Sequence, residues 1–227
     1  MKTLLHICCA PCANQCIDVL RGDHYEVTGY WYNPNIHPFT EYRARRNCLR
    51  EYAQTIDLPL IERNDYGLRP FVRAVADDIE HRCVKCYEFR LFEAARMAKE
   101  GGFDSFTSSL FISPYQQHEL MREVAERAAA EYGVEFLYRD FRPYFRAGQE
   151  RARELGCENT HFTNTNGLQN IDHYTTAWDL SLIAREARTH ERFMRICGTK
   201  SVEIPATNLS PKRTYYTTNY LISNWRA

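Results

Sequence analysis

Short apolar runs alternate with longer amphipathic stretches along the first two thirds of the chain. The apolar runs predict five strands, at residues 4–7, 26–31, 58–62, 103–107 and 134–138. The longer stretches predict helices at residues 13–20, 41–56, 69–79, 83–101, 116–132 and 149–155. Strands that alternate with helices across short links are typical of a parallel sheet covered by helices on both faces. We therefore predict an α/β fold with right-handed crossovers.

Local signals mark the ends of two predicted helices. Gly101 and Gly102 end the helix that begins at residue 83, whose apolar spacing is the most regular in the chain. Thr40 stands directly before the run that begins at residue 41, and we expect it to cap that helix. The polar segment 108–115 is expected to form a loop.

The pattern changes near Cys157. The following stretch is polar and rich in Asn and Thr, a helix is plausible over residues 178–196, and the tail beyond residue 200 shows no readable period. We expect an α/β metal-binding catalytic domain over residues 1–156. Residues 157–227 are expected to form an irregular and helical extension packed on it.

Charge and composition narrow the possible partners. The 29 Lys and Arg residues balance 29 Asp and Glu residues, so any contact with nucleic acid must use a local patch. No apolar run approaches the ~20 residues that a membrane span needs, and the N-terminus is unlike a signal peptide. We therefore expect a cytoplasmic protein without a membrane contact. In that compartment the nine cysteines favour metal or redox chemistry over disulfides.

Five cysteines form two short motifs. Cys8, Cys9 and Cys12 follow the first predicted strand, and Cys83 and Cys86 open a later predicted helix. If the fold brings the two turns together, enough thiols converge for an iron–sulfur cluster or a zinc site. Adjacent cysteines suit a cluster or two neighbouring centres better than one tetrahedral zinc ion. A dithiol redox pair stays open, because a Cys-x-x-Cys motif at a helix start is also the thioredoxin-like arrangement.

Side chains in loops and on one helix are candidates for substrate contact. Asp140 follows the fifth strand and could transfer a proton or simply pair with a neighbouring arginine. Tyr32 and Tyr115 lie in loops after strands, where they could stack on a base, line the crevice or pack. A basic helix face that includes Arg43 and Arg46 could bind phosphates or form a solvated surface.

Five motifs occur in order between residues 4 and 156. They are Leu5-His6-Ile7-Cys8-Cys9-Ala10-Pro11-Cys12, Tyr32-Asn33-Pro34-Asn35-Ile36-His37-Pro38, Arg82-Cys83-x-x-Cys86-Tyr87-x-x-Arg90-Leu91, Ser109-Leu110-x-x-Ser113-Pro114-Tyr115 and Phe136-Leu137-Tyr138-Arg139-Asp140-Phe141-Arg142. This set resembles the QueH family, the iron-dependent epoxyqueuosine reductases. The resemblance implies a nucleotide-hydrolase-like sheet. It also implies removal of the epoxide oxygen from epoxyqueuosine at the wobble position of the tRNA anticodon.

The resemblance further implies cofactors and partners. It implies a [4Fe-4S] cluster beside an additional iron or zinc ion, with ligands among Cys8, Cys9, Cys12, Cys83 and Cys86. An unidentified electron donor would supply the electrons, and Asp140 or Tyr115 would deliver a proton. We expect the tRNA anticodon to contact Tyr32 and the basic residues Arg43, Arg46, Arg139 and Arg142.

One family motif is missing from this chain. Where the family continues with a Tyr-Cys-Gly-Cys motif, this chain offers only Cys157 and His161 as replacements. The metal site could be completed by Cys157, by His161 or by water, or the second metal could be lost. An altered C-terminal sequence could also leave a relative without reductase activity. A zinc-stabilised tRNA-binding domain and a thiol-based sulfur-transfer protein are the rival interpretations.

Overall fold

The computed structural model describes residues 1–162, 171–204 and 211–218, which divide into two compact units. The first unit lies within residues 1–148. The second is built from residues 149–162 and the described residues that follow. The packing of residues 157–227 on the α/β domain stays a prediction.

The first unit contains a five-stranded parallel sheet in the order β3-β2-β1-β4-β5. The strands are β1 (Lys2–His6), β2 (Glu26–Trp31), β3 (Leu60–Glu62), β4 (Ser105–Ser108) and β5 (Glu135–Phe136). At the centre, Leu5 of β1 is in register with Gly29 of β2 and with Thr107 of β4. The predicted α/β fold is confirmed, while its nucleotide-hydrolase-like type stays a prediction.

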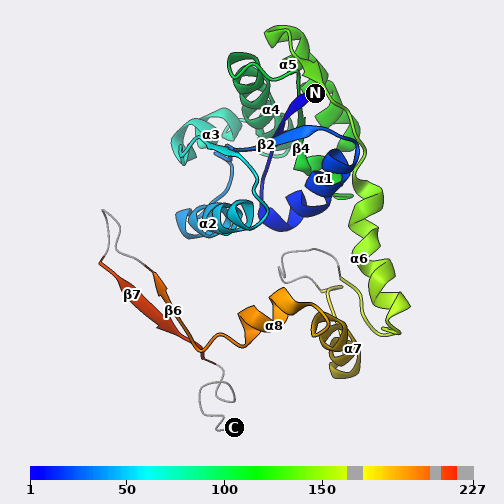
Figure 1. Ribbon diagram of the computed structural model, residues 1–227. Coiled ribbons are helices and arrows are strands. Elements are labelled where there is room, and N and C mark those ends of the chain that lie inside the picture. Colours follow the sequence, from blue (N-terminus) through cyan, green and yellow to red (C-terminus); the bar gives the residue numbers. More distant parts are fainter. Residues whose placement is uncertain (163–170, 205–210, 219–227) are drawn as a thin grey trace. The chain divides into compact units, whose positions relative to one another are not determined.

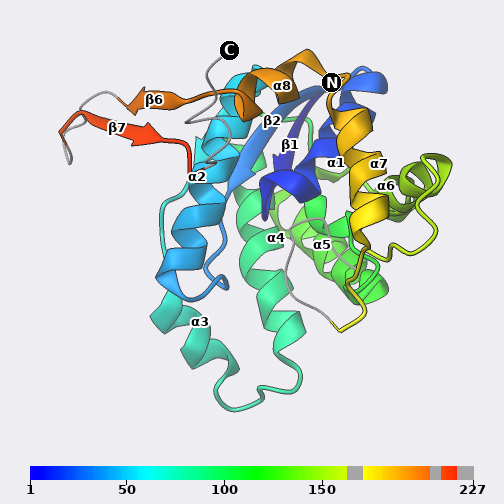
Figure 2. The same ribbon diagram turned by 90° about the horizontal axis from the view of Figure 1, so that it is seen from below.

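Helices cover both faces of this sheet (Figures 1 and 2). The helices of this unit are α1 (Ala10–Gly22), α2 (Phe39–Thr55), α3 (Leu68–Val75), α4 (Arg82–Glu100) and α5 (His118–Tyr132). A further helix, α6 (Arg142–Glu154), follows β5 and contains the boundary between the two units. The helices α1 and α2 contact each other on one side, and α4 packs along α5 on the other. Each strand of this sheet is followed in the chain by a helix. Because crossovers between parallel strands are right-handed, α1 and α2 lie on one face of the sheet, and α4 and α5 lie on the other.

Some local predictions were wrong. The residue that precedes α2 is Pro38, and no side chain caps this helix, so Thr40 is not its cap. The segment expected to be a loop contains a 3₁₀ helix, η1 (Ser109–Ile112), capped by the Ser108 hydroxyl. Helix α6 begins seven residues earlier than predicted. Pro143 is compatible with that start, because the first turn of a helix does not use its N–H groups.

The second unit differs more from expectation. The helix predicted over residues 178–196 is divided into α7 (Ala177–Ala187) and α8 (Glu191–Cys197). The Thr176 side chain caps α7 by accepting a hydrogen bond from the backbone N–H of Asp179 at 3.1 Å. The tail contains an antiparallel pair, β6 (Ser201–Ile204) and β7 (Arg213–Tyr216), which the sequence pattern did not reveal. Within the described residues, no helix is long and apolar enough to cross a membrane.

Candidate metal centre at the end of the central strand

The first cysteine motif lies in the turn between β1 and α1. Cys8 comes two residues after β1, and Cys9 is the residue that precedes α1. Strand β1 is the central strand of the sheet. From its neighbour β2 the chain continues to β3 at one edge, and from its other neighbour β4 it continues to β5 at the opposite edge. In open parallel sheets this switch of direction leaves a crevice outside the carboxyl ends of the strands. The motif therefore occupies the place where such folds bind their ligands.

The three thiols of this turn converge. Their sulfur atoms all lie within 4.8 Å of one another, with 3.9 Å between Cys8 and Cys9 and 2.8 Å between Cys9 and Cys12. The helix start explains this, because residues at the cap and three positions later share one side of the first turn. Among the described residues, no other group of three or more His, Cys, Asp or Glu side chains brings its ligand atoms this close together.

Buried polar side chains from the adjacent strands hold the turn. His6 is fully buried between them, and its Nε2 donates a hydrogen bond to the Tyr32 carbonyl oxygen at 3.1 Å. Its Nδ1 then accepts from the Ser108 hydroxyl at 2.8 Å. Burial, followed by the charge of Arg90, lowers the pKa of His6 to about 4, so the ring is neutral at physiological pH. His6 is therefore a hydrogen-bonded core residue.

Two further side chains fix the cysteine turn itself. The Asn33 amide donates to the carbonyl oxygen of Ile7 at 2.9 Å, and Ser109 Oγ accepts from the backbone N–H of Cys8 at 3.3 Å. The first comes from the loop after β2 and the second from η1, directly after β4. The turn is thus held from both sides, which preorganises its thiols.

Hydrogen bonds and burial shift the pKa values of the three thiols in different directions. Hydrogen bonds from Cys12 and Cys9 lower the pKa of Cys8. The hydrogen bond that Cys9 accepts from Cys12 lowers the pKa of Cys9. Its hydrogen bond to Cys8 and its burial act in the opposite direction and together raise this pKa to about 12. Donation to Cys8 and Cys9 raises the pKa of Cys12. Three close thiolates repel one another, so a cation is needed to ionise them together. This donor set fits a thiophilic metal or an iron–sulfur cluster.

The second cysteine motif lies in the first turn of α4. Both Cys83 and Cys86 are half-buried, and Arg90 donates hydrogen bonds to Cys86 at its carbonyl oxygen and at Sγ. These two cysteines are not part of the three-thiol group. Their convergence with the first motif on one centre stays a prediction. Arg90 stands in a quoted motif, but its role was missed because nothing in the sequence shows that it is buried.

Cys157 lies in the core of the second unit. Its side chain is packed with Ala152 and Leu182, and its Sγ donates to the Asp179 carbonyl oxygen at 3.5 Å. Burial raises the pKa of this thiol. The His161 Nδ1 donates to the Asp172 carbonyl oxygen at 2.7 Å. The role of either residue as a replacement ligand stays a prediction.

The two predicted proton donors have different surroundings. The Asp140 carboxylate accepts hydrogen bonds from the backbone N–H and the guanidinium of Arg142, at 2.7 to 3.1 Å. Arg142 lowers the pKa of Asp140, so the carboxyl is ionised at neutral pH and is a poor acid. The sequence also allowed Asp140 simply to pair with a neighbouring arginine, and its ion pair with Arg142 is present. Tyr115 is 67% exposed, with its ring edge-on to Phe145.

The residues predicted to bind tRNA vary in accessibility. Tyr32 is buried, and the Arg63 guanidinium lies over its ring at 4.7 Å, which leaves little surface for a base. Arg43 is exposed on α2, whereas Arg46 on the same helix bonds to Asn64. Two other arginines are already in ion pairs, Arg139 with Asp23 at 2.9 Å and Arg142 with Asp140 at 2.7 Å.

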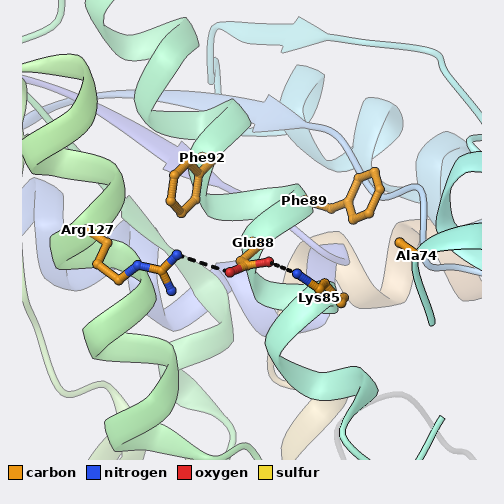
Figure 3. Close-up of a pocket in the computed structure, with 6 residues that line it drawn as sticks. All are labelled: Ala74, Lys85, Glu88, Phe89, Phe92 and Arg127. Carbon is orange, nitrogen blue, oxygen red and sulfur yellow. Dashed lines mark hydrogen bonds and ion pairs between the residues drawn. The ribbon is translucent and has the colours of Figure 1, made fainter. Parts of the chain in front are cut away.

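A pocket of about 630 Å³ lies along α4, away from the cysteines (Figure 3). It is lined by Ala74, Lys85, Glu88, Phe89, Phe92 and Arg127. In Figure 3 the Glu88 carboxylate forms ion pairs with both Lys85 and Arg127. The helical period places these α4 residues on a different face from Cys83, Cys86 and Arg90. This pocket is therefore separate from the candidate metal centre.

The fold and this turn define an α/β protein with a group of three thiols that could hold a metal, at the switch point of a doubly wound sheet. A family model described as epoxyqueuosine reductase QueH matches residues 3–162, and the chain belongs to this family. The protein named epoxyqueuosine reductase QueH from Dehalococcoides mccartyi is 38% identical over 141 residues, which are 62% of this chain and 78% of that protein. Those of Histophilus somni and Haemophilus influenzae are each 34% identical over 68% of this chain. The matched parts are 65% and 64% of their own lengths.

The C-terminal part of the chain is similar to a different family. A model described as D-alanyl-D-alanine carboxypeptidase matches residues 143–226. That match covers less than half of the chain, and much of it lies beyond residue 162, where the first match ends. The matched residues include the stretch near Cys157, where the sequence pattern changes and the expected Tyr-Cys-Gly-Cys motif is missing.

Proposed function

We propose that this chain is an oxidoreductase that reduces the epoxide of epoxyqueuosine in tRNA to give queuosine. The three converging thiols at the end of β1 carry this proposal, because they lie inside the region shared with proteins named epoxyqueuosine reductase. The overall reaction consumes two electrons and two protons. The epoxide oxygen leaves as water, and a carbon–carbon double bond remains.

Cys8, Cys9 and Cys12 would hold the metal group, and Cys83 and Cys86 would complete its ligands. We propose a [4Fe-4S] cluster with an additional iron or zinc ion. When bound, this group supplies the electrons, received from a separate donor, and a Lewis acid for the oxygen. The protein holds the thiols in place through Asn33 and Ser109.

The proton has one accessible candidate donor in this arrangement. Tyr115 is exposed in the segment after β4, whereas Asp140 is held ionised by Arg142. We therefore favour Tyr115 as the donor and propose that Asp140 positions Arg142. That arginine, Arg139, Arg43 and Arg46 would contact tRNA phosphates. The ring of Tyr32 would reach a base only after Arg63 moves aside.

Metal analysis of anaerobically purified protein tests the proposal. We expect about four iron and four sulfide per chain, a broad visible absorption band, and extra metal. The variant Cys12→Ser should lose most of the iron and sulfide, whereas Cys48→Ser, at an exposed position on α2, should retain both. Zinc without sulfide in the wild type would instead favour the zinc-stabilised tRNA-binding relative.

An activity assay separates metal binding from catalysis. The loaded protein, supplied with a chemical reductant and epoxyqueuosine-containing tRNA, should convert the modified nucleoside to queuosine. Loaded protein that binds the tRNA but leaves the epoxide intact would contradict the reductase assignment.

A further inference from the structure

Arg90 is a buried cation aimed at the second cysteine motif. Its side chain is only 4% exposed, which is rare for an arginine without a bound anion. Its Nε donates to the Cys86 carbonyl oxygen at 3.0 Å, and its Nη2 donates to Cys86 Sγ at 2.9 Å. Among the described residues, no carboxylate is paired with Arg90.

A second contact keeps this guanidinium in place. The Arg90 Cζ atom lies 5.8 Å from the centre of the Tyr87 ring. The Tyr87 hydroxyl donates to Gln116 Oε1 at 2.8 Å and accepts from the backbone N–H of Gln117 at 3.1 Å. The ring is therefore tied to the segment that follows β4. Arg90 rests on this fixed ring and has little freedom to swing away from Cys86.

We infer that Arg90 is a positioning residue for the proposed metal centre, which orients the Cys86 sulfur and supplies a fixed positive charge to the bound group. This inference rests on the proposed function. A metal-bound cysteine is a thiolate, and a buried thiolate balances the cost of burying the guanidinium. Hydrogen bonds to ligand sulfur and the net charge nearby set the reduction potential of iron–sulfur clusters. Arg90 therefore makes the group easier to reduce.

The test compares Arg90→Gln and Arg90→Lys with the control Arg127→Gln, at an exposed arginine on α5. Circular dichroism checks that each variant folds. Iron and sulfide content and the midpoint potential, from an anaerobic redox titration followed by absorption, are the readouts. Arg90→Gln should shift the midpoint to a more negative value, while the control stays at the wild-type value. Arg90→Lys keeps the charge but not both hydrogen bonds, so its midpoint should lie between that of Arg90→Gln and that of the wild type.

A wild-type midpoint and wild-type metal content in folded Arg90→Gln or Arg90→Lys would overturn the inference. If the wild type holds zinc without sulfide, the proposed function fails but Arg90 is still tested. Zinc should then pass to a chelator at least several-fold faster from Arg90→Gln than from the control. Equal rates of zinc loss would overturn the role of Arg90, and a wild type that holds no metal would overturn both proposals.

Discussion

The hydroxyl oxygen of Ser109 accepts a hydrogen bond from the backbone N–H of Cys8 at 3.3 Å, so the first residue after β4 holds the cysteine turn that follows β1. The same hydroxyl donates to Cys8 Sγ at 3.7 Å. Ser109 is fully buried. The position of the first thiol thus depends on a residue 101 positions away in the chain.

Replacing Ser109 with alanine should loosen this turn. The variant leaves the Cys8 N–H buried without an acceptor, which costs about 1–3 kcal/mol of folding free energy. We expect a lower midpoint of urea unfolding and reduced iron content after reconstitution. The control Ser181→Ala changes an exposed serine that bonds within its own helix turn. Equal metal content in Ser109→Ala and the wild type would show that this bond does not position the thiol.

A glycine before α3 should be intolerant of any side chain. Gly67 has a φ of +62°, and a Cβ added there would lie 2.3 Å from the Cβ of Pro34. Left-handed strain and overpacking together predict a loss of about 2–4 kcal/mol for Gly67→Ala. Gly22, at the end of α1, has nothing within 4 Å of an added Cβ, so Gly22→Ala should be neutral or stabilise by up to about 1 kcal/mol. Urea unfolding measures both variants, and equal effects would contradict the predicted clash.

His118 should make stability fall as the pH decreases. Burial, followed by the charge of Arg142, lowers the pKa of this ring, although Asp140 and Glu119 act in the opposite direction. The folded pKa lies below the unfolded value of about 6.5, so below that pH the unfolded chain binds more protons. The stabilising contribution of the neutral ring is present above pH 6.5 and is lost as the pH falls toward the folded pKa.

The variant His118→Gln isolates this contribution. The difference in unfolding free energy between pH 7 and pH 5 should be smaller in His118→Gln than in the wild type. The exposed control His190→Gln should keep the wild-type difference. Unchanged pH dependence in His118→Gln would contradict the predicted neutral state of the ring.

Charge reversal on α2 should weaken tRNA binding in a salt-dependent manner. Each phosphate contact releases counterions, so its loss reduces the slope of log affinity against log salt concentration by roughly one. We expect this change for Arg43→Glu in a filter-binding titration. Arg127→Glu, on α5 across the sheet, should keep the wild-type slope. The same slope in all three proteins would exclude Arg43 from the tRNA contact.

Much of the sheet could be predicted from local pattern. The strand predicted over residues 26–31 is β2 with the same bounds, and the helix predicted from residue 83 is α4 to within one residue at each end. Central parallel strands are buried on both faces and therefore appear as continuous apolar runs. The β6-β7 pair was missed because its strands are only four residues long and lack an apolar run. The early start of α6 was missed because Pro143 reads as a helix breaker.

The sequence by itself determined that Cys8, Cys9 and Cys12 lie together, because five consecutive residues at a strand–helix turn cannot separate far. It also determined the family, since the matching motifs lie along the chain in order. Only the tertiary structure decided that Ser109 holds Cys8 and that Arg90 is buried against Cys86. The order of strands and the burial of a charged side chain depend on contacts between distant segments. Local residue spacing carries no information about such contacts.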